Sequence, residues 1–353
     1  MQIVTLFCMN QLLKQYRIGT ATLRFGLTCL LYVSVWQYGC AQIDPGLTTS
    51  AALTDPACRT ITVSRVMPTT VAPAPIPQGL PTPVFSQQTG TLAYGTTVSI
   101  TATGMPTNAF IEYSTDNGTS WVKGTSAPVV SKKPILARVR VNDLTSATAT
   151  ATVTPFFKRT MIIGNSIMSH APAPNLGWTN TNGMAASAPD KDFVYLLTTN
   201  LKRLNSNMQV NLYSGGSFER YFGLPSYSVD EFVLPVQSFK PDLIVVRIGE
   251  NVTEADVTAR NFLGEYRQFL DKLASQAGGP VQIICSTSVW NRPKYDAVVR
   301  QVAAEKGYPV ADMKSMVGVP SFFASQYANA DVAAHPNDTG MQRIADILWD
   351  SLP

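Results

Sequence analysis

The residues best suited to chemistry lie in the stretch Met161-Ile162-Ile163-Gly164-Asn165-Ser166-Ile167-Met168. An apolar run typical of a buried β-strand ends in a glycine and a small polar residue, and Ser166 follows at the turn. A parallel α/β sheet presents a nucleophile in this way, because the glycine permits a tight turn and the serine opens the next helix. The serine hydroxyl then lies near unpartnered backbone N–H groups and the positive end of a helix dipole. The stretch predicts a catalytic site only if a base and an oxyanion pocket follow downstream.

The elements that must position this serine alternate between strand and helix from Lys158 onward. The expected strands are residues 160–163, 208–213, 243–248, 281–285 and 308–311, and the expected helices are 190–204, 254–276, 293–306 and 338–352. Such alternation requires a parallel sheet with helices on both faces. Sites in these sheets form at the carboxyl ends of the strands, and Ser166 lies just beyond one of them.

Three further short blocks fall at or near the expected strand ends: Val210–Gly216, Arg247–Asn251 and Ala334–Asp338. Together with Gly164-Asn165-Ser166 they resemble the SGNH (GDSL-type) hydrolase family, which is named for a Ser, a Gly, an Asn and a His from four such blocks. The resemblance covers residues 158–353. It implies a three-layer, flavodoxin-like parallel sheet and hydrolysis of an ester through an acyl-serine intermediate.

The resemblance assigns the nucleophile to Ser166 and the general base to His335. A serine hydroxyl needs a neighbouring base at neutral pH, and the chain has only two histidines. The other, His170, follows the nucleophile by four residues, so we expect it past the turn, where it can line the substrate pocket. His335, in a late loop before the last expected helix, is the better base.

The oxyanion of a tetrahedral intermediate needs hydrogen-bond donors that are fixed in advance. The resemblance implies the backbone N–H of Ser166, the N–H of Gly216 and the side chain of Asn251, with Gly215 as an alternative for the middle donor. The first block reads Gly-Asn-Ser where many family members have Gly-Asp-Ser. We expect the loss of charge at Asn165 to be harmless.

The acid that orients the base is the main departure from the family pattern. The family places an aspartate three residues before the histidine, and that position is Val332. Asp331 is one residue further away and reaches the imidazole if the chain bulges. Glu250 and Asp338 are other candidates, and a Ser–His dyad oriented by a backbone carbonyl is a further alternative.

The glycine-rich loop 177–187 carries Trp178 next to the nucleophile. Trp178 is interpreted either as a substrate-facing wall or as a residue that packs the loop against the sheet. The sequence has no His/Cys cluster with metal-ligand spacing, so neither a metal nor a cofactor is expected.

The N-terminal part of the chain predicts export. Residues 1–41 hold three of the 27 basic residues and no acid, and the apolar run Phe25–Trp36 is shorter than the ~20 residues of a membrane span. The small residues Gly39-Cys40-Ala41 suit cleavage before Gln42, so residues 1–41 are interpreted as a signal peptide of a secreted or periplasmic protein. A lipoprotein anchor at Cys40 is a less favoured alternative.

Two segments separate the signal from the α/β part. Residues 42–80 are rich in Thr, Ala and Pro and predict an extended linker. Residues 81–156 form short alternating runs with a tight-turn signal at Asp116-Asn117-Gly118, which predicts an all-β sandwich resembling the fibronectin-type-III-like accessory modules of secreted carbohydrate-active enzymes. The expected domains are therefore 1–41, 42–80, 81–156 and 158–353.

The predicted function is hydrolysis of an ester by an exported serine esterase. Export, linker and sandwich together favour an O-acetyl group on a carbohydrate as the substrate. A lipase or thioesterase-like acyl hydrolase and a catalytically idle carbohydrate-binding or surface protein are the alternatives. The chain is 14% charged, and outside residues 1–41 it has 24 basic against 23 acidic residues, so nucleic acid is not an expected partner.

Overall fold

The computed structural model describes residues 79–353. The predicted signal peptide, nearly all of the predicted linker and the alternative anchor at Cys40 lie outside these residues. In the part of the chain that the structure describes, no helix is long and apolar enough to cross a membrane.

Two β-sheets form the N-terminal part of the described chain. The first contains β1 (Val84–Phe85), β3 (Thr97–Thr101) and β6 (Ser126–Pro128), in that order. The second has the order β2 (Thr89–Ala93), β9 (Ala149–Phe156), β7 (Ile135–Val141), β4 (Phe110–Ser114) and β5 (Val122–Lys123), with β8 (Leu144–Thr145) paired to β7. Alternate residues of β7 are buried, and their side chains join one apolar cluster with β3, β4 and β9. The predicted all-β module is therefore confirmed, whereas the exact domain limits stay predictions.

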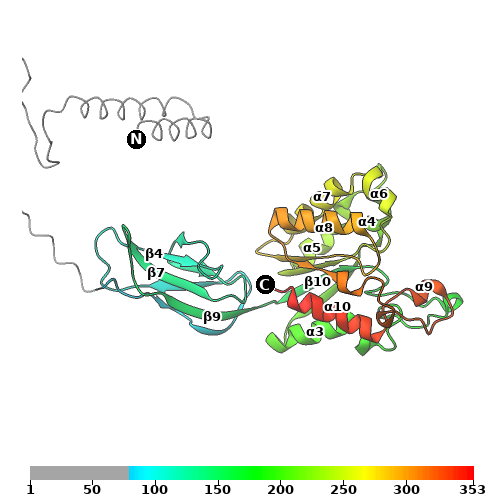
Figure 1. Cartoon of the computed structure of the whole chain (residues 1–353), viewed down its shortest axis with the longest axis horizontal. Coiled ribbons are helices and arrows are strands. Elements are labelled where there is room, and N and C mark those ends of the chain that lie inside the picture. The colour runs from blue at the N-terminus through cyan, green and yellow to red at the C-terminus, as the bar shows by residue number, and fades with distance from the viewer. Residues whose placement is uncertain (1–78) are drawn as a thin grey trace, which may run out of the picture. The chain divides into compact units, whose positions relative to one another are not determined.

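A five-stranded parallel sheet forms the C-terminal part (Figure 1). Its order is β11 (Gln209–Ser214), β10 (Arg159–Gly164), β12 (Leu243–Arg247), β13 (Gln282–Ser286) and β14 (Val310–Ala311). Chain order 2-1-3-4-5 is the flavodoxin-like arrangement, in which the chain reverses direction between its first and third strands. This confirms the predicted fold class and places the ends of β10 and β12 side by side at the reversal.

Helices cover both faces of this sheet, as Figure 1 shows. On one face lie α3 (Phe193–Leu204) and α10 (Asp338–Asp350). On the other lie α4 (Gly216–Tyr221), α5 (Val233–Phe239), α6 (Glu254–Ala259), α7 (Phe262–Gln276) and α8 (Pro293–Lys306). Met161 and Ile163 of β10 pack into the second layer and Ile162 packs into the first, because successive strand residues point to opposite faces. Strand β10 is thus packed on both faces up to its end, where the turn with Ser166 begins.

Two expected local structures are wrong. Residues 254–276 form two helices, because Asn261 adopts a left-handed conformation (φ 51°) and its side chain caps α7 at the Gly264 N–H. Ser166 opens no helix: it lies in a turn, and the next α-helix is α3, which begins at Phe193. The helix dipole expected at Ser166 is therefore missing, and other groups must hold the serine.

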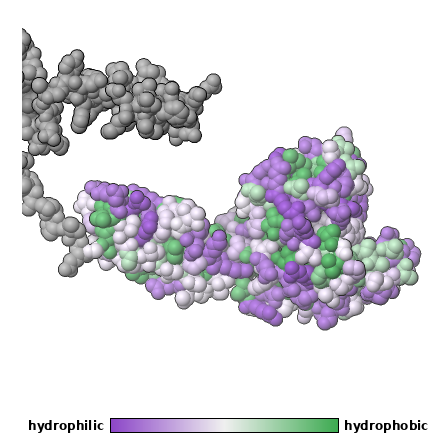
Figure 2. Space-filling model, in the orientation of Figure 1, coloured by the Kyte–Doolittle hydropathy of each residue, from purple (hydrophilic) through white to green (hydrophobic). Residues whose placement is uncertain are grey.

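The visible surface is mixed in polarity. In Figure 2 hydrophilic and neutral residues cover most of the face shown, with hydrophobic residues scattered among them.

Candidate functional site

Ser166 and His335 meet at the carboxyl end of the parallel sheet. The Ser166 Oγ lies 2.8 Å from His335 Nε2, although the two residues are 169 positions apart in the chain. Ser166 follows β10, and His335 lies in the loop between the short helix α9 (Ala330–Ala333) and α10. The sequence predicted both residues, and the structure brings them into hydrogen-bond contact.

The imidazole of His335 is oriented by a backbone carbonyl. His335 Nδ1 lies 2.7 Å from the carbonyl oxygen of Asp331. A carbonyl can only accept, so Nδ1 carries the proton and Nε2 presents a lone pair to the serine hydroxyl. Among the described residues the Asp331 carboxylate makes no hydrogen bond to the ring, so Asp331 contributes its main chain and not the acid expected of it.

The end of α9 leaves this carbonyl available. In a continuing helix the Asp331 carbonyl would accept from the N–H of His335, but that N–H donates to the Val332 carbonyl at 3.0 Å. The free carbonyl then accepts from the side chain of the same histidine. Asn329 fixes the start of α9 by accepting from the N–H groups of Asp331 and Val332.

Neighbouring groups hold the His335 loop in place. The His335 carbonyl accepts from the Ala324 N–H at 3.0 Å, and the Asn337 amide donates to the carbonyls of Ser321 and Phe323. Trp290 meets the imidazole edge-on, with ring centroids 5.8 Å apart. Because His335 is only 6% exposed, burial lowers its pKa and favours the neutral ring that a base requires.

The Glu219 carboxylate links two of the four sequence blocks, those of Asn165 and of Asn251. Its Oε2 accepts from the Asn251 side-chain amide at 2.7 Å. Its Oε1 accepts from the Gly249 N–H at 2.6 Å, the Asn251 N–H at 3.3 Å and the Asn165 amide at 3.0 Å. The side chain lies on α4 and is fully buried, and burial together with the nearby charge of Glu250 raises its pKa.

Glu250 belongs to the same buried network but does not touch the base. Its carboxylate pairs with Arg247 at 2.6 Å and accepts from the Ser288 hydroxyl and the Val289 N–H. Burial alone would raise the pKa of Glu250, but the Arg247 guanidinium and these hydrogen bonds lower it to about 2. No hydrogen bond between Glu250 and His335 is found within residues 79–353, so Glu250 does not act as the orienting acid.

The contacts of Asn165 explain why an asparagine stands where many family members have an aspartate. Its amide nitrogen donates to Glu219 at 3.0 Å and to Glu250 at 2.6 Å, while its oxygen accepts from the Ile167 N–H. An aspartate here would place a third carboxylate against two others. The amide is therefore a structural bridge beneath the nucleophile turn, a role beyond the harmless replacement expected from the sequence.

The expected oxyanion donors differ in availability. The Gly215 N–H donates to the Gly164 carbonyl at 2.7 Å, which removes it as the alternative middle donor. The Gly216 N–H makes only a 3.2 Å hydrogen bond to the Ser214 hydroxyl. The Ser166 N–H donates to no backbone carbonyl of the described chain, and Asn251 has a second amide hydrogen beyond the one bound by Glu219.

These groups line one pocket of about 350 Å³. Polar residues form much of its wall, namely Ser166, Ser214, Asn251, His335, Arg220 and Asp331, and the apolar part comes from Ala171, Leu176 and Met184. His170 also lines the pocket, and its Nδ1 bonds the Ala171 carbonyl. Trp178 does not line it: the indole is 1% exposed and packs with Met184, Ala324 and Val332, so the expectation of a substrate-facing tryptophan is wrong.

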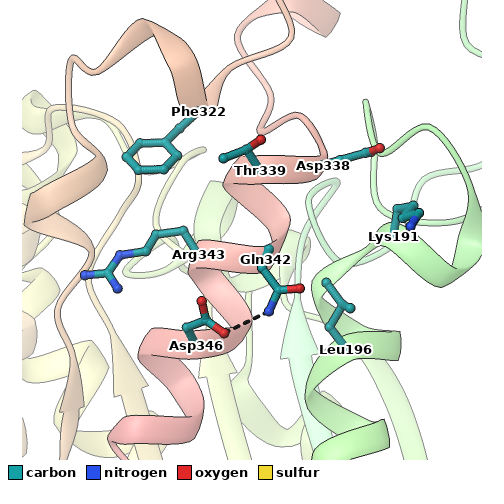
Figure 3. A pocket seen from close by; sticks show the side chains of 8 residues that line it. All are labelled: Lys191, Leu196, Phe322, Asp338, Thr339, Gln342, Arg343 and Asp346. Atoms are coloured by element: carbon teal, nitrogen blue, oxygen red, sulfur yellow. Dashed lines mark hydrogen bonds between the residues drawn. The ribbon is translucent and has the colours of Figure 1, made fainter.

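Asp338 lies in a different hollow, of about 440 Å³, between α10 and the start of α3 (Figure 3). Its carboxylate accepts from the N–H and hydroxyl of Ser187. Lys191, Arg343 and Asp346 also line this hollow, but it contains no nucleophile next to a base. Asp338 is therefore not positioned to orient His335.

Two groups of the site were not predicted from the sequence: Glu219 in the buried network and Arg220 in the pocket wall. Both lie on α4, a helix of six residues that was not expected, and a buried glutamate in so short a segment has no periodic signal. Across residues 79–353 no group of three or more His, Cys, Asp or Glu side chains is placed to hold a metal ion.

Comparison with known proteins gives one sequence-level match. The profile of the GDSL-like Lipase/Acylhydrolase family matches residues 162–343. A search of curated proteins finds no match.

Solved structures with similar regions are distant. A two-domain esterase (CEX) active on acetylated mannans is 18% identical with a TM-score of 0.38, over 55% of this chain and 48% of that one. The match thus spans about half the length of that esterase. TesA is 16% identical with a TM-score of 0.36, over 55% and 97% of the two chains, and the esterase EstA from Pseudoalteromonas sp. is 13% identical with a TM-score of 0.33, over 55% and 96%.

Proposed function

This chain belongs to the GDSL-like Lipase/Acylhydrolase family, and we propose that it hydrolyses ester bonds through a Ser166–His335 dyad. The single observation that carries the assignment is the 2.8 Å contact between Ser166 Oγ and His335 Nε2, with Nδ1 held by the Asp331 carbonyl. In this proposal the carbonyl replaces the triad acid by fixing the tautomer and the ring orientation.

Ser166 attacks the ester carbonyl while its proton passes to His335 Nε2. The tetrahedral intermediate collapses when the imidazolium returns that proton to the leaving alcohol, which leaves an acyl-serine. A water molecule then attacks the acyl group with His335 again as the base, and release of the acid regenerates the serine. No other titratable group is required in either half of the reaction.

The negative oxygen of the intermediate is stabilised by the N–H groups of Ser166 and Gly216 and by the Asn251 amide. The weak 3.2 Å hydrogen bond from Gly216 to Ser214 is one that a substrate oxygen can replace. Glu219 acts as a positioning residue, because it binds both the N–H and the side chain of Asn251 and leaves one amide hydrogen for the substrate. Donors fixed in this way each lower the barrier by about 3–4 kcal/mol where they have been measured.

We propose that the substrate is a short acyl ester on a polar alcohol, with O-acetyl groups on a carbohydrate as the first class. Hydroxyl, amide and charged side chains dominate the rim of the pocket, and its apolar part is limited to three side chains. A small acyl group fits such a wall, whereas a long chain needs a larger apolar surface. Export by the N-terminal segment belongs to the same proposal, because polymeric carbohydrates lie outside the cell.

Hydrolysis of p-nitrophenyl acetate by the mature protein tests the proposal. We expect turnover by the wild type and a fall to background in Ser166→Ala and in His335→Ala. Wild-type protein without turnover would favour the idle binding protein. A comparison of acetyl with long-chain acyl esters, and then of acetylated with unacetylated oligosaccharides, separates the carbohydrate esterase from a lipase or thioesterase.

A further inference from the structure

Arg220 places a positive charge in the proposed catalytic pocket. It lines the same cavity as Ser166, His335 and Asn251, and its side chain is exposed. We infer that Arg220 is a binding site for an anionic group of the substrate, and that the substrate is an acylated sugar bearing a carboxylate. This inference rests on the proposed function and names the substrate class within it.

The guanidinium is held at a defined position beside the oxyanion donors. Arg220 Nη1 donates to the Gly216 carbonyl at 3.0 Å, across one turn of α4. A Cβ atom on residue 216 would lie 2.8 Å from the same nitrogen, so the guanidinium packs closely against this glycine. The charge therefore lies directly against Gly216, whose N–H is a proposed oxyanion donor.

Arg220 has no acidic partner within the described residues. Arg247, Arg260, Arg267 and Arg300 each pair with a carboxylate, but no carboxylate oxygen lies within 4.0 Å of the Arg220 guanidinium. Glu219, its neighbour in sequence, points into the buried network and is occupied by four donors. The carboxylate that does line the pocket, that of Asp331, comes from α9 and makes no ion pair with Arg220.

An exposed guanidinium with free donors recognises a carboxylate through two parallel N–H···O hydrogen bonds. Nη1 is partly used by Gly216, which leaves the other N–H groups for a ligand. Because the reacting carbonyl oxygen must lie at Gly216, a carboxylate on Arg220 would be attached to the same small substrate molecule. A uronic acid residue that carries an acyl group on a ring hydroxyl has both groups within one sugar ring.

The test compares methyl glucuronoside with methyl glucoside, both acetylated at the same ring hydroxyl, which differ only at C6, a carboxylate in the first and a hydroxymethyl group in the second. We expect wild-type kcat/KM to favour the glucuronoside by about 10-fold or more, and Arg220→Gln to reduce this ratio to about 1. Arg220→Lys keeps the charge without the planar fork and should give an intermediate ratio. Arg203→Gln removes an exposed arginine of α3 outside the pocket and is the matched charge control, for which the wild-type ratio is expected.

Two results would overturn the inference. One is a wild-type kcat/KM ratio near 1. The other is an equal loss of kcat/KM on both sugars in Arg220→Gln, which would mean that the arginine only stabilises the oxyanion or the helix α4. Binding of the two unacetylated glycosides to Ser166→Ala, measured by calorimetry, requires no turnover. Tighter binding of the glucuronoside that Arg220→Gln abolishes supports the inference even if hydrolysis fails, so the two proposals can fail separately.

Discussion

The Glu219 carboxylate holds Asn251 at two points, accepting from its side-chain amide at 2.7 Å and from its backbone N–H at 3.3 Å. The glutamate comes from α4 and the asparagine from the turn after β12, so the contact joins two segments that are 32 residues apart. Gly249 donates to the same carboxylate at 2.6 Å. Asn251 is thereby fixed before substrate arrives, which is the condition for an effective oxyanion donor.

Glu219→Gln should lower kcat by about 10- to 100-fold with a smaller change in KM, because a misplaced amide loses part of the transition-state stabilisation of one donor. An amide at this site also turns an NH₂ group toward N–H donors. Thermal unfolding should therefore show a loss of about 1–3 kcal/mol for the buried groups left unpaired.

A double-mutant cycle with Asn251→Ala separates positioning from general destabilisation. If Glu219 acts through Asn251, then Glu219→Gln should cost much less kcat in the Asn251→Ala background than in the wild type. Equal costs in both backgrounds would contradict this role. Glu219→Asp keeps the charge at a shorter reach and should recover part of the activity.

Asn165→Asp tests the bridge between the two buried glutamates. The new carboxylate would be buried beside Glu219 and Glu250, so its pKa in the folded state should lie above the ordinary value near 4. A carboxyl with a raised folded-state pKa destabilises the protein as pH rises through that value. The variant should therefore be close to wild type in stability near pH 4 and lose up to about 3–5 kcal/mol at pH 8.

The measurement is the free energy of unfolding from urea titrations between pH 4 and pH 8. Asn207→Asp places the same change on an exposed residue and should show no such slope. A pH-independent deficit in Asn165→Asp would mean that only the lost hydrogen bonds matter, and that the added charge is neutralised or solvated.

Ser166 and His335 could be singled out from the sequence because strand ends and block order are local signals. An apolar strand that ends in Gly-Asn-Ser and a His-Pro block before an amphipathic helix each occupy a few consecutive residues. The topology rule places Ser166 at the carboxyl end of the sheet, and the resemblance to the SGNH family matched it to His335 across 169 positions. The five strands of the parallel sheet were predicted for the same reason. Their observed first residues lie within two positions of the expected ones, and their last residues lie within one.

The supporting groups could not be predicted, since their roles depend on contacts made only in the fold. Glu219 follows Phe218 on a one-and-a-half-turn helix, and nothing local distinguishes a buried glutamate from an exposed one there. The acceptor for His335 is a main-chain carbonyl, which every residue has, so side-chain spacing pointed to the carboxylate of Asp331 instead. Trp178 was ambiguous because an aromatic side chain suits either a pocket wall or a core.

The contact between His335 Nδ1 and the Asp331 carbonyl predicts a small effect of Asp331→Asn. The backbone oxygen on Nδ1 is unchanged by the substitution, so kcat for p-nitrophenyl acetate should stay within about threefold of wild type. A true triad aspartate costs about 10⁴-fold when it is replaced by asparagine. A loss of that size would show that the Asp331 carboxylate reaches the imidazole during turnover and would contradict the dyad.

The pH profile of kcat/KM should show the lowered pKa of His335. The free base must be neutral, so activity rises as the imidazole loses its proton, and burial shifts this step below the usual value near 6.5. Half-maximal kcat/KM is therefore expected below pH 6.5. Between the lowered pKa of the folded state and the ordinary pKa of the unfolded state, the unfolded chain binds the proton more readily than the folded one. The free energy of unfolding should therefore also decrease as pH falls through this window.

Glu219 is a second group whose pKa is shifted, because burial and the charge of Glu250 raise it. Repeating the profile in Glu219→Gln removes that group, and the step that remains belongs to His335. Direct titration of the His335 ring by NMR in Ser166→Ala gives the same pKa without turnover. A midpoint at or above 6.5 in both experiments would show that the imidazolium is stabilised, as a carboxylate on Nδ1 would do, and would exclude the backbone carbonyl as the only partner of the base.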